Sequence, residues 1–131
     1  MSIEALEDLV ERYIQAYNAL DVEGMISLMH PQCLFRHVSA GNVTVSTTSL
    51  KEFRDLAEES GTWFSTRRQI VNGKEWVGDA LKVDIDFQGV LAVDLPNGPA
   101  EGHTLKLTGK SVFTFRDGLI FELTDYADAT T

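Results

Sequence analysis

The hydrophobic pattern of this 131-residue chain changes its period at Gly61. Before this glycine, apolar residues recur every three or four positions, which is typical of amphipathic helices. After it, apolar and polar residues alternate, which is typical of strands that bury one face. Helices followed by a run of antiparallel strands predict an α+β domain whose helices lie on one face of the sheet.

Three helices are predicted in the first half of the chain. The first covers residues 3–20, and Ser2 is a suitable N-cap for it. Asp21 is expected to cap a short second helix, which ends before Pro31 because proline cannot continue it. The sequence SLKE at residues 49–52 has the form of a capping box, so a third helix is expected to follow it.

Five strands are predicted, and turn signals separate some of them. Asn72-Gly73 and Asp117-Gly118 are dipeptides that favour tight hairpin turns. Gly89 is interpreted as a bulge in a long bent strand, because glycine inside a strand often marks one. The strands are expected at about residues 33–38, 63–71, 80–93, 103–116 and 119–126.

Composition narrows the class of function. The length fits one domain over residues 1–131, without repeats or a low-complexity linker. No apolar run approaches the ~20 residues that a membrane span needs, so no membrane partner is expected. A formal net charge of −9 disfavours nucleic acid, because phosphate backbones are repelled. Cys33 is the only cysteine, which excludes an internal disulfide and favours a cytoplasmic location.

Two segments carry a family resemblance: VERYIQAYNALDVEGMISLMHPQCLFRHV at residues 10–38 and GKSVFTFRDGLIFELTDYAD at residues 109–128. The chain resembles the nuclear transport factor 2-like (NTF2-like) superfamily, particularly its SnoaL-like and ketosteroid-isomerase-like branches. The resemblance implies a cystatin-like cone, in which a curved mixed antiparallel sheet is wrapped by three helices around an apolar pocket. It also implies a homodimer formed through the outer face of the sheet.

Alternation along the strands indicates which residues face the pocket. Leu81, Val83, Ile85 and Phe87 are in phase with one another, and Lys82, Asp84 and Asp86 point the other way. In the next strand Gly109 shares the inner face, where its missing side chain makes room for a ligand or for another backbone. The residues expected to line a ligand site are Tyr17, Phe35, Phe53, Phe87, Leu105, Ser111, Phe113 and Leu123.

Ketosteroid isomerases use a carboxylate to move a proton, and a tyrosine and a protonated aspartic acid hold the enolate oxygen. The resemblance implies that Tyr13 corresponds to the tyrosine that holds the enolate oxygen. This chain has His37 where the shuttling aspartate is expected and Ser111 where the second donor is expected. Steroid isomerisation is therefore excluded as the specific activity, because a serine hydroxyl is a much weaker oxyanion donor than a carboxylic acid.

His37 and Asp125 form the candidate catalytic pair. In the last strand Leu119, Phe121, Leu123 and Asp125 alternate onto one face, and the resemblance brings that face to the catalytic zone. Imidazole is the usual base near neutral pH, and a carboxylate beside it would fix its tautomer. The alternative is that His37 is a core histidine and that Asp125 ends its strand in solvent.

Other polar residues have simpler interpretations. Asp84 and Asp86 are expected in solvent or at a dimer interface, and His30 at a helix C-terminus. His103 follows the loop PNGPAEG at residues 96–102, which is a candidate cover for the pocket mouth. No spacing typical of metal ligands and no nucleotide-binding motif is present, so neither a metal nor another cofactor is expected.

The roles of several further residues stay open. Tyr13 and Tyr17 lie on one helical face, where aromatic residues usually belong to the core. Trp63, Phe64 and Trp76 either line the pocket or fill the core. Arg67 and Arg68 give no clear match to the Asp-Arg-Asp arrangement of the superfamily's limonene epoxide hydrolases.

Two functions fit these residues. The first is a cofactor-independent enzyme for isomerisation, cyclisation, dehydration or hydration of a small, largely apolar carbonyl compound. In it His37 is the general base or acid, Asp125 orients His37, and Tyr13 donates a hydrogen bond to the substrate oxygen. The second is a non-catalytic dimeric module that binds a small ligand in the same pocket.

Overall fold

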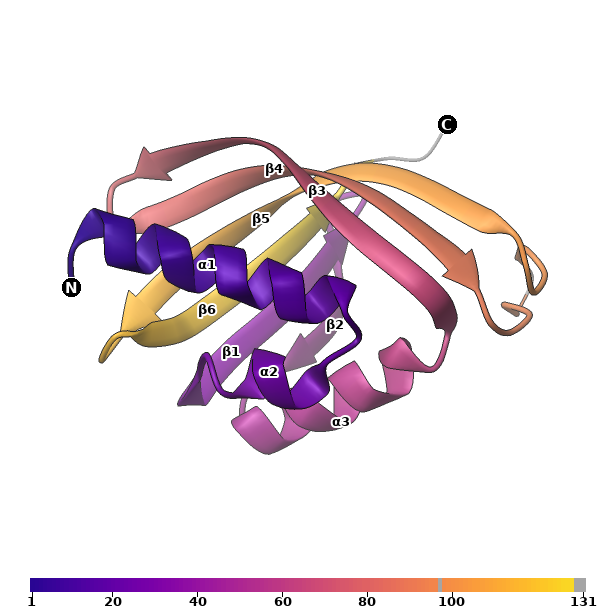
Figure 1. The fold of residues 1–131 in the computed structure, drawn as a ribbon, viewed down its shortest axis with the longest axis horizontal. Helices are drawn as coiled ribbons and strands as arrows, with labels where there is room; N and C mark the ends of the chain where they lie inside the picture. Colours follow the sequence, from indigo (N-terminus) through magenta and orange to yellow (C-terminus); the bar gives the residue numbers. More distant parts are fainter. Residues whose placement is uncertain (97, 129–131) are drawn as a thin grey trace.

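The computed structural model describes residues 1–96 and 98–128. In that part of the chain, three helices lie against one six-stranded sheet (Figure 1). The strand order is β2-β1-β6-β5-β4-β3; β1 and β6 are parallel, and every other pair is antiparallel. The elements are α1 (Ile3–Asn18), α2 (Val22–Ile26), β1 (Met29–Ser39), β2 (Asn42–Thr47), α3 (Leu50–Gly61), β3 (Phe64–Val77), β4 (Ala80–Leu91), β5 (Thr104–Arg116) and β6 (Leu119–Ala127).

The predicted N-caps are confirmed. Ser2 accepts a hydrogen bond from the amide of Ala5, and Asp21 accepts one from the amide of Gly24. Ser49 accepts from the amide of Glu52. The Glu52 carboxylate reaches back to Thr48 rather than to the N-cap amide. Each cap satisfies a backbone donor that the first helical turn leaves free, so each helix begins where the sequence predicts.

The helices cover one face of the curved sheet and build the core with it. In Figure 1, α1 crosses the sheet while α2 and α3 lie beside β1 and β2. α1 packs against β3 and β6, and α3 packs against β1 and β2. The predicted α+β arrangement, with the helices on one face of the sheet, is therefore confirmed. The core includes Leu9, Ile14, Met25, Cys33, Val83 and Ile120.

The segment around Pro31 differs from the sequence prediction. The second helix ends at Ile26, and β1 already begins at Met29, so Pro31 lies inside a strand. The prediction that His30 ends a helix is therefore wrong. Its Nε2 lies 3.0 Å from a carboxylate oxygen of Asp117, and its Nδ1 accepts from the amide of Gln32. Strand β2 was not predicted, because four of its six residues are polar and five are exposed at this edge of the sheet.

Asn72-Gly73 is not a hairpin turn. β3 continues through both residues, and its register with β4 shifts between Val71 and Gly73, which makes Asn72 the extra residue of a bulge. The turn comes later at Gly78, whose φ of +60° lies in the left-handed region that glycine tolerates. The second predicted hairpin, at Asp117-Gly118, is confirmed, because both residues have positive φ between β5 and β6.

A bulge also changes the face of β6. Its register with β5 shifts between Thr114 and Phe115, which leaves Phe121 without a partner on β5. Consequently Ile120, with no exposed surface, enters the core together with Leu123, and the prediction that Phe121 shares their face is wrong. The ring of Phe121 instead lies 5.4 Å from that of His30.

The two strand glycines have packing roles. Gly89 is not a bulge, because its register with both neighbouring strands is regular. A Cβ atom there would lie 2.7 Å from the ring of Phe64. At Gly109 a Cβ atom would lie 2.2 Å from the carbonyl oxygen of Tyr126. Of the two explanations open for Gly109, the close approach of another backbone is therefore the one observed.

Candidate functional site

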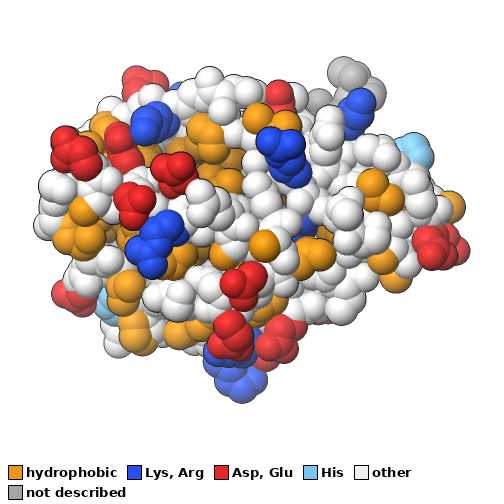
Figure 2. Space-filling view, viewed as in Figure 1, with side chains coloured by type: hydrophobic (Ala, Val, Ile, Leu, Met, Phe, Trp, Pro, Cys, Tyr) orange, Lys and Arg blue, Asp and Glu red, His pale blue; other side chains and the backbone are white. Residues whose placement is uncertain are grey.

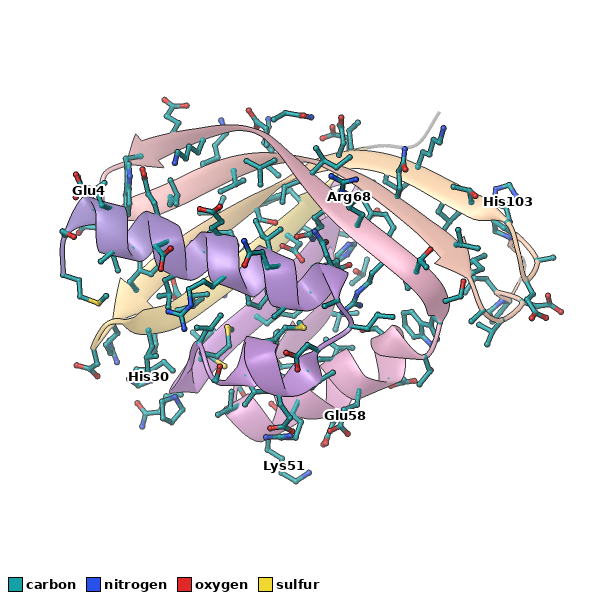
Figure 3. The ribbon with its side chains drawn as sticks, viewed as in Figure 1. Glu4, His30, Lys51, Glu58, Arg68 and His103 are labelled. Atoms are coloured by element: carbon teal, nitrogen blue, oxygen red, sulfur yellow. The ribbon has the colours of Figure 1, made fainter. Side chains whose placement is uncertain are left out.

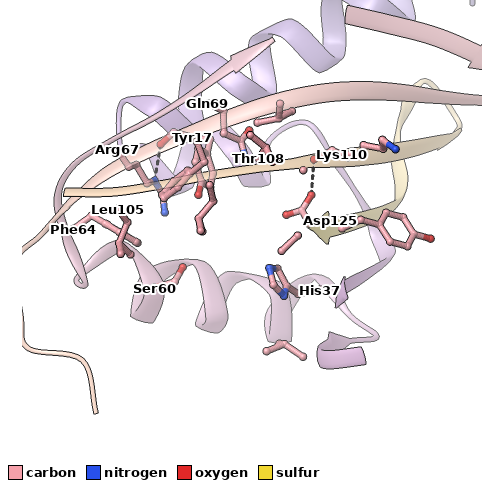
Figure 4. A pocket seen from close by; sticks show the side chains of 18 of the residues that line it. Tyr17, His37, Ser60, Phe64, Arg67, Gln69, Leu105, Thr108, Lys110 and Asp125 are labelled. Carbon is pink, nitrogen blue, oxygen red and sulfur yellow. Dashed lines mark hydrogen bonds between the residues drawn. The ribbon is translucent and has the colours of Figure 1, made fainter. Parts of the chain in front are cut away.

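A cavity of about 490 Å³ lies between the sheet and α3 and opens to solvent. This volume is within the usual range of about 300–1,000 Å³ for small-molecule sites. The wall is mostly apolar, and Figure 4 shows polar side chains reaching into it from several elements. Apolar residues on the wall include Phe35, Leu56, Phe64, Ile85, Phe87 and Leu105.

The predicted site residues divide into two groups. One group lines the cavity, and the other packs in the core behind its wall. The lining group contains Tyr17, Phe35, His37, Phe87, Leu105, Ser111 and Asp125. The core group is not on the wall and contains Tyr13, which was expected to donate to the substrate, and Phe53, Phe113 and Leu123, which were expected to line the site.

Asp125 lies in the wall and is held by Ser111. The Ser111 hydroxyl donates a 2.7 Å hydrogen bond to a carboxylate oxygen of Asp125, and the two residues are register partners on β5 and β6. Burial raises the pKa of Asp125 above its ordinary value of 3.8. The bond from Ser111 and the charge of His37 offset part of that rise. A carboxyl group in this environment takes up a proton more readily than one in water.

His37 lies opposite Asp125 on the neighbouring strand. The two are register partners on β1 and β6, and Figure 4 shows both side chains directed into the same part of the cavity. Each has another partner, however, and no hydrogen bond or ion pair joins them among the contacts of the described residues. The prediction that Asp125 orients His37 stays a prediction.

Thr44 holds the imidazole of His37. The Nδ1 atom lies 3.0 Å from the Thr44 hydroxyl oxygen, which is itself 3.2 Å from the carbonyl oxygen of His37. A hydroxyl group has one hydrogen, which goes either to that carbonyl or to Nδ1, according to the tautomer of the ring. The contact therefore fixes the position of the imidazole without selecting its donor nitrogen.

The two tyrosines of α1 differ in their access to the cavity. Tyr13 is 4% exposed, and its ring packs edge-on against Phe113 at 5.9 Å between centroids. Burial and the nearby Asp125 carboxyl raise its pKa well above 10. Tyr17 lines the cavity, and burial raises its pKa to about 12. Both phenols therefore stay protonated at neutral pH, and only Tyr17 contributes to the wall.

Arg67 is a cavity residue that the sequence did not single out. It is 5% exposed, lies on β3 and lines the wall. Its Nε donates a 2.9 Å hydrogen bond to the carbonyl oxygen of Tyr17, and its guanidinium carbon lies 3.7 Å from the centre of the Tyr17 ring. Burial lowers the pKa of the Arg67 guanidinium from 12.5. Arg68, by contrast, is exposed (Figure 3).

A bulge explains why alternation did not identify Arg67. The register of β3 with β4 shifts between Phe64 and Thr66, so Ser65 is an extra residue. Strict alternation places positions 64 and 67 on opposite faces. The bulge brings both Phe64 and Arg67 to the inner face, opposite Leu91 and Gly89. The only feature of the sequence that could have indicated a cavity role for Arg67 was an arginine within an otherwise amphipathic strand.

Of the remaining candidates, only Trp63 reaches the cavity wall among the described residues. Asp84 and Asp86 are not on its wall, and His103 is exposed near the end of β5 (Figure 3). Trp63 lines the cavity. Trp76 packs on Phe115 and donates a 2.9 Å hydrogen bond to Glu7. In the loop at 96–102, Asn97 lies outside the described residues.

Residues 1–96 and 98–128 contain neither a metal-ligand cluster nor a helix suited to a membrane. No three His, Cys, Asp or Glu side chains there are grouped as metal ligands. None of the helices has the length and apolar character required to cross a bilayer. On the face shown in Figure 2, acidic and basic side chains are interspersed.

Known proteins share this fold. AclR from Streptomyces galilaeus, a proposed hydroxylase, is 19% identical with a TM-score of 0.77, over 96% of this chain and 90% of that one. A proposed polyketide cyclase from Silicibacter sp. TM1040 is 20% identical with a TM-score of 0.73, over 97% and 91%. TerC, crystallised with polyporic acid, is 17% identical with a TM-score of 0.74, over 95% and 92%.

At these identities the structural neighbours establish the fold alone. No protein with a curated description matches the chain. The model of the SnoaL-like domain family matches residues 10–123, which is most of the chain and includes both β1 and the larger part of β6. The chain therefore belongs to the SnoaL-like domain family.

Proposed function

We propose that this protein is a cofactor-independent enzyme that transfers a proton to or from a small, largely apolar carbonyl compound. The observation that carries the proposal is Asp125, a carboxyl group with a raised pKa in the wall of an apolar cavity. General acid–base catalysis is most effective when the pKa of the catalytic group approaches the working pH. Burial moves Asp125 in that direction.

The neighbours of Asp125 support a defined role for it. Ser111 holds one carboxylate oxygen, which fixes the orientation of the group and leaves the other oxygen available to a ligand. His37 supplies a second group for proton transfer on the same side of the cavity. Asp125 and His37 together would remove a proton from one atom of a substrate and return it to another.

A hydrogen-bond donor to the substrate oxygen completes the proposed set. Tyr13 was expected in this role, but it lies in the core behind the wall. The proposal therefore gives the role to Tyr17, which lines the cavity and whose pKa of about 12 keeps its phenol protonated. Isomerisation, cyclisation, dehydration and hydration all use such a donor together with an acid–base group.

The comparisons are compatible with this class of reaction. Family membership and a neighbour proposed as a polyketide cyclase agree with chemistry on carbonyl compounds. TerC, crystallised with polyporic acid, is an example in which this fold was studied with an organic acid. A homodimer through the outer sheet face and a cytoplasmic location stay predictions.

The experiment measures proton exchange directly. Cyclic ketones and 1,3-diketones are incubated in D₂O with the wild-type protein, and NMR follows the loss of the signal from the protons beside the carbonyl. We expect exchange above the buffer rate, reduced at least 100-fold by Asp125→Asn. Asp84→Asn is the matched control, because it removes a carboxylate that is not on the cavity wall.

The outcome separates the two functions. If the wild-type protein binds these ketones and exchanges no protons above the buffer rate, the enzyme proposal is refuted and a non-catalytic binding module is favoured. If Asp125→Asn leaves a measurable rate unchanged, Asp125 is not the proton-transfer group. His37→Gln then tests whether the imidazole alone performs the exchange.

A further inference from the structure

Arg67 is a buried cation that has no carboxylate partner among the described residues. Its side chain is almost completely shielded from solvent, and none of the ion pairs formed within residues 1–96 and 98–128 includes it. A buried charge is costly unless it is paired and hydrogen-bonded. An arginine kept in such a place therefore needs a compensating partner.

The protein satisfies only part of the guanidinium group. Arginine has five N–H donors. Nε donates to the carbonyl oxygen of Tyr17, and Nη2 lies 3.8 Å from the sulfur of Met25, which is a weak acceptor. No described residue accepts a hydrogen bond from Nη1. Because Arg67 lines the cavity, the free donors are accessible to a ligand there.

Anchoring α1 to β3 does not require this charge. The side chain of Asn18 already joins the end of α1 to β3 through two hydrogen bonds with the backbone of Gln69, at 3.2 and 2.7 Å. The single bond from Arg67 to Tyr17 adds to that anchor and uses one donor of five. A purely structural role leaves the other donors unexplained.

Arg67 and Asp125 lie at different ends of the cavity. Arg67 is in register with Gly89 and, through it, with Leu105 of β5, whereas Asp125 is in register with Ser111 farther along the same strand. Figure 4 shows Arg67 near Phe64 and Leu105, with Asp125 and His37 toward the opposite end. The wall between these polar ends is mainly apolar.

We propose that Arg67 is a binding subsite for an acidic oxygen of the ligand, so that the substrate is an organic acid with an apolar body. The acidic oxygen is that of a carboxylate, whose two coplanar oxygens match the guanidinium fork. The reacting carbon then lies at the other end of the molecule, beside Asp125. This inference rests on the proposed function for the position of the reacting atom, but the binding subsite itself does not depend on turnover.

The test compares two probes of nearly the same shape. 2-Naphthoate carries a carboxylate, and 2-naphthamide replaces it with a neutral amide. Calorimetry or ligand-observed NMR at low ionic strength gives both dissociation constants. A charge-assisted hydrogen bond in a buried site predicts that the wild-type protein binds naphthoate about 10- to 100-fold more tightly than naphthamide.

Variants identify the residue responsible. Arg67→Gln should remove the preference for naphthoate and change the affinity for naphthamide by less than about threefold. Arg67→Lys should keep part of the preference, because it retains the charge but loses the planar fork. Arg68→Gln, which removes the adjacent and exposed arginine, should retain the full preference. Circular dichroism verifies that each variant is folded.

Each outcome decides the proposal. It is overturned if the wild-type protein binds both probes equally, a comparison that needs no variant to fold, or if folded Arg67→Gln still prefers naphthoate. Asp125→Asn distinguishes this inference from the proposed function. Loss of exchange without loss of the naphthoate preference supports both. A naphthoate preference that depends on Arg67, without any exchange in the wild-type protein, supports the subsite and refutes the enzyme.

Discussion

Replacing Gly109 by alanine tests the backbone contact between β5 and β6. An ideal Cβ atom at this position would lie 2.2 Å from the carbonyl oxygen of Tyr126, about 1.2 Å short of ordinary contact, which begins at 3.4 Å. The obstacle is backbone, so no rotation of a side chain relieves it. The strands must separate locally, and two hydrogen bonds between Thr108 and Asp128 are the first affected. The amide of Asp128 donates to the carbonyl oxygen of Thr108 at 3.0 Å, and the hydroxyl of Thr108 donates to the carboxylate of Asp128 at 2.7 Å.

The expected cost follows from these contacts. Overpacking costs about 1–3 kcal/mol, and each hydrogen bond lost costs about 0.5–1.5 kcal/mol. We therefore expect Gly109→Ala to lower the free energy of unfolding by about 2–4 kcal/mol. Urea unfolding, followed by tryptophan fluorescence, measures this value. Because the contact lies two residues from Ser111, the substitution should also weaken proton exchange.

Gly61→Ala is the matched control. A Cβ atom at Gly61, the last residue of α3, meets nothing within 4 Å. Alanine there should be neutral or should stabilise the protein by up to about 1 kcal/mol, because glycine is the poorer helix former. If Gly109→Ala unfolds within 0.5 kcal/mol of the wild type, the argument from the close backbone approach is incorrect.

Two more predictions concern stability. Folding raises the pKa of the Asp125 carboxyl group above 3.8. The free energy of unfolding of the wild-type protein therefore falls as the pH rises from 3.8 through the pKa of the folded state, whereas an asparagine at this position causes no such fall. At pH 7 the Asp125→Asn variant should therefore be more stable than the wild type, by about 1.4 kcal/mol for each pH unit by which folding raises the pKa. Urea titrations should show that this difference vanishes below pH 3.8. A difference that does not change with pH contradicts the prediction. Phe113→Ala should lower the free energy of unfolding by about 3–5 kcal/mol, because Phe113 is 1% exposed in the core. A thermal unfolding temperature close to that of the wild type would be inconsistent with that packing.

The sequence by itself determined where the helices begin and on which strands the site would lie. Ser2, Asp21 and Ser49 cap helices through bonds to residues three positions ahead, so short-range chemistry is sufficient to predict them. Likewise, alternation in β4 and β5 correctly placed Val83 and Ser111 on the inner face, because these two strands pair without a shift in register.

Several predictions failed at bulges, which local sequence patterns do not reveal. A bulge depends on how two strands align along their whole length, and one extra residue exchanges the two faces beyond it. The extra residue Ser65 brings Arg67 to the inner face, and the extra residue Phe121 brings Ile120 into the core. The extra residue Asn72 lies within β3, where a hairpin turn was expected. The unpredicted strand β2 has a different cause, because an exposed edge strand needs no strong hydrophobic pattern.

Only the tertiary structure decided the environment of each polar group. The sequence selected Asp125 and His37, but the partners that orient them, Ser111 and Thr44, come from neighbouring strands. The cavity likewise depends on how α3 packs over the sheet. Arg67 shows the difference most clearly, because its charge is plain in the sequence, while its burial without a carboxylate results from packing among distant segments.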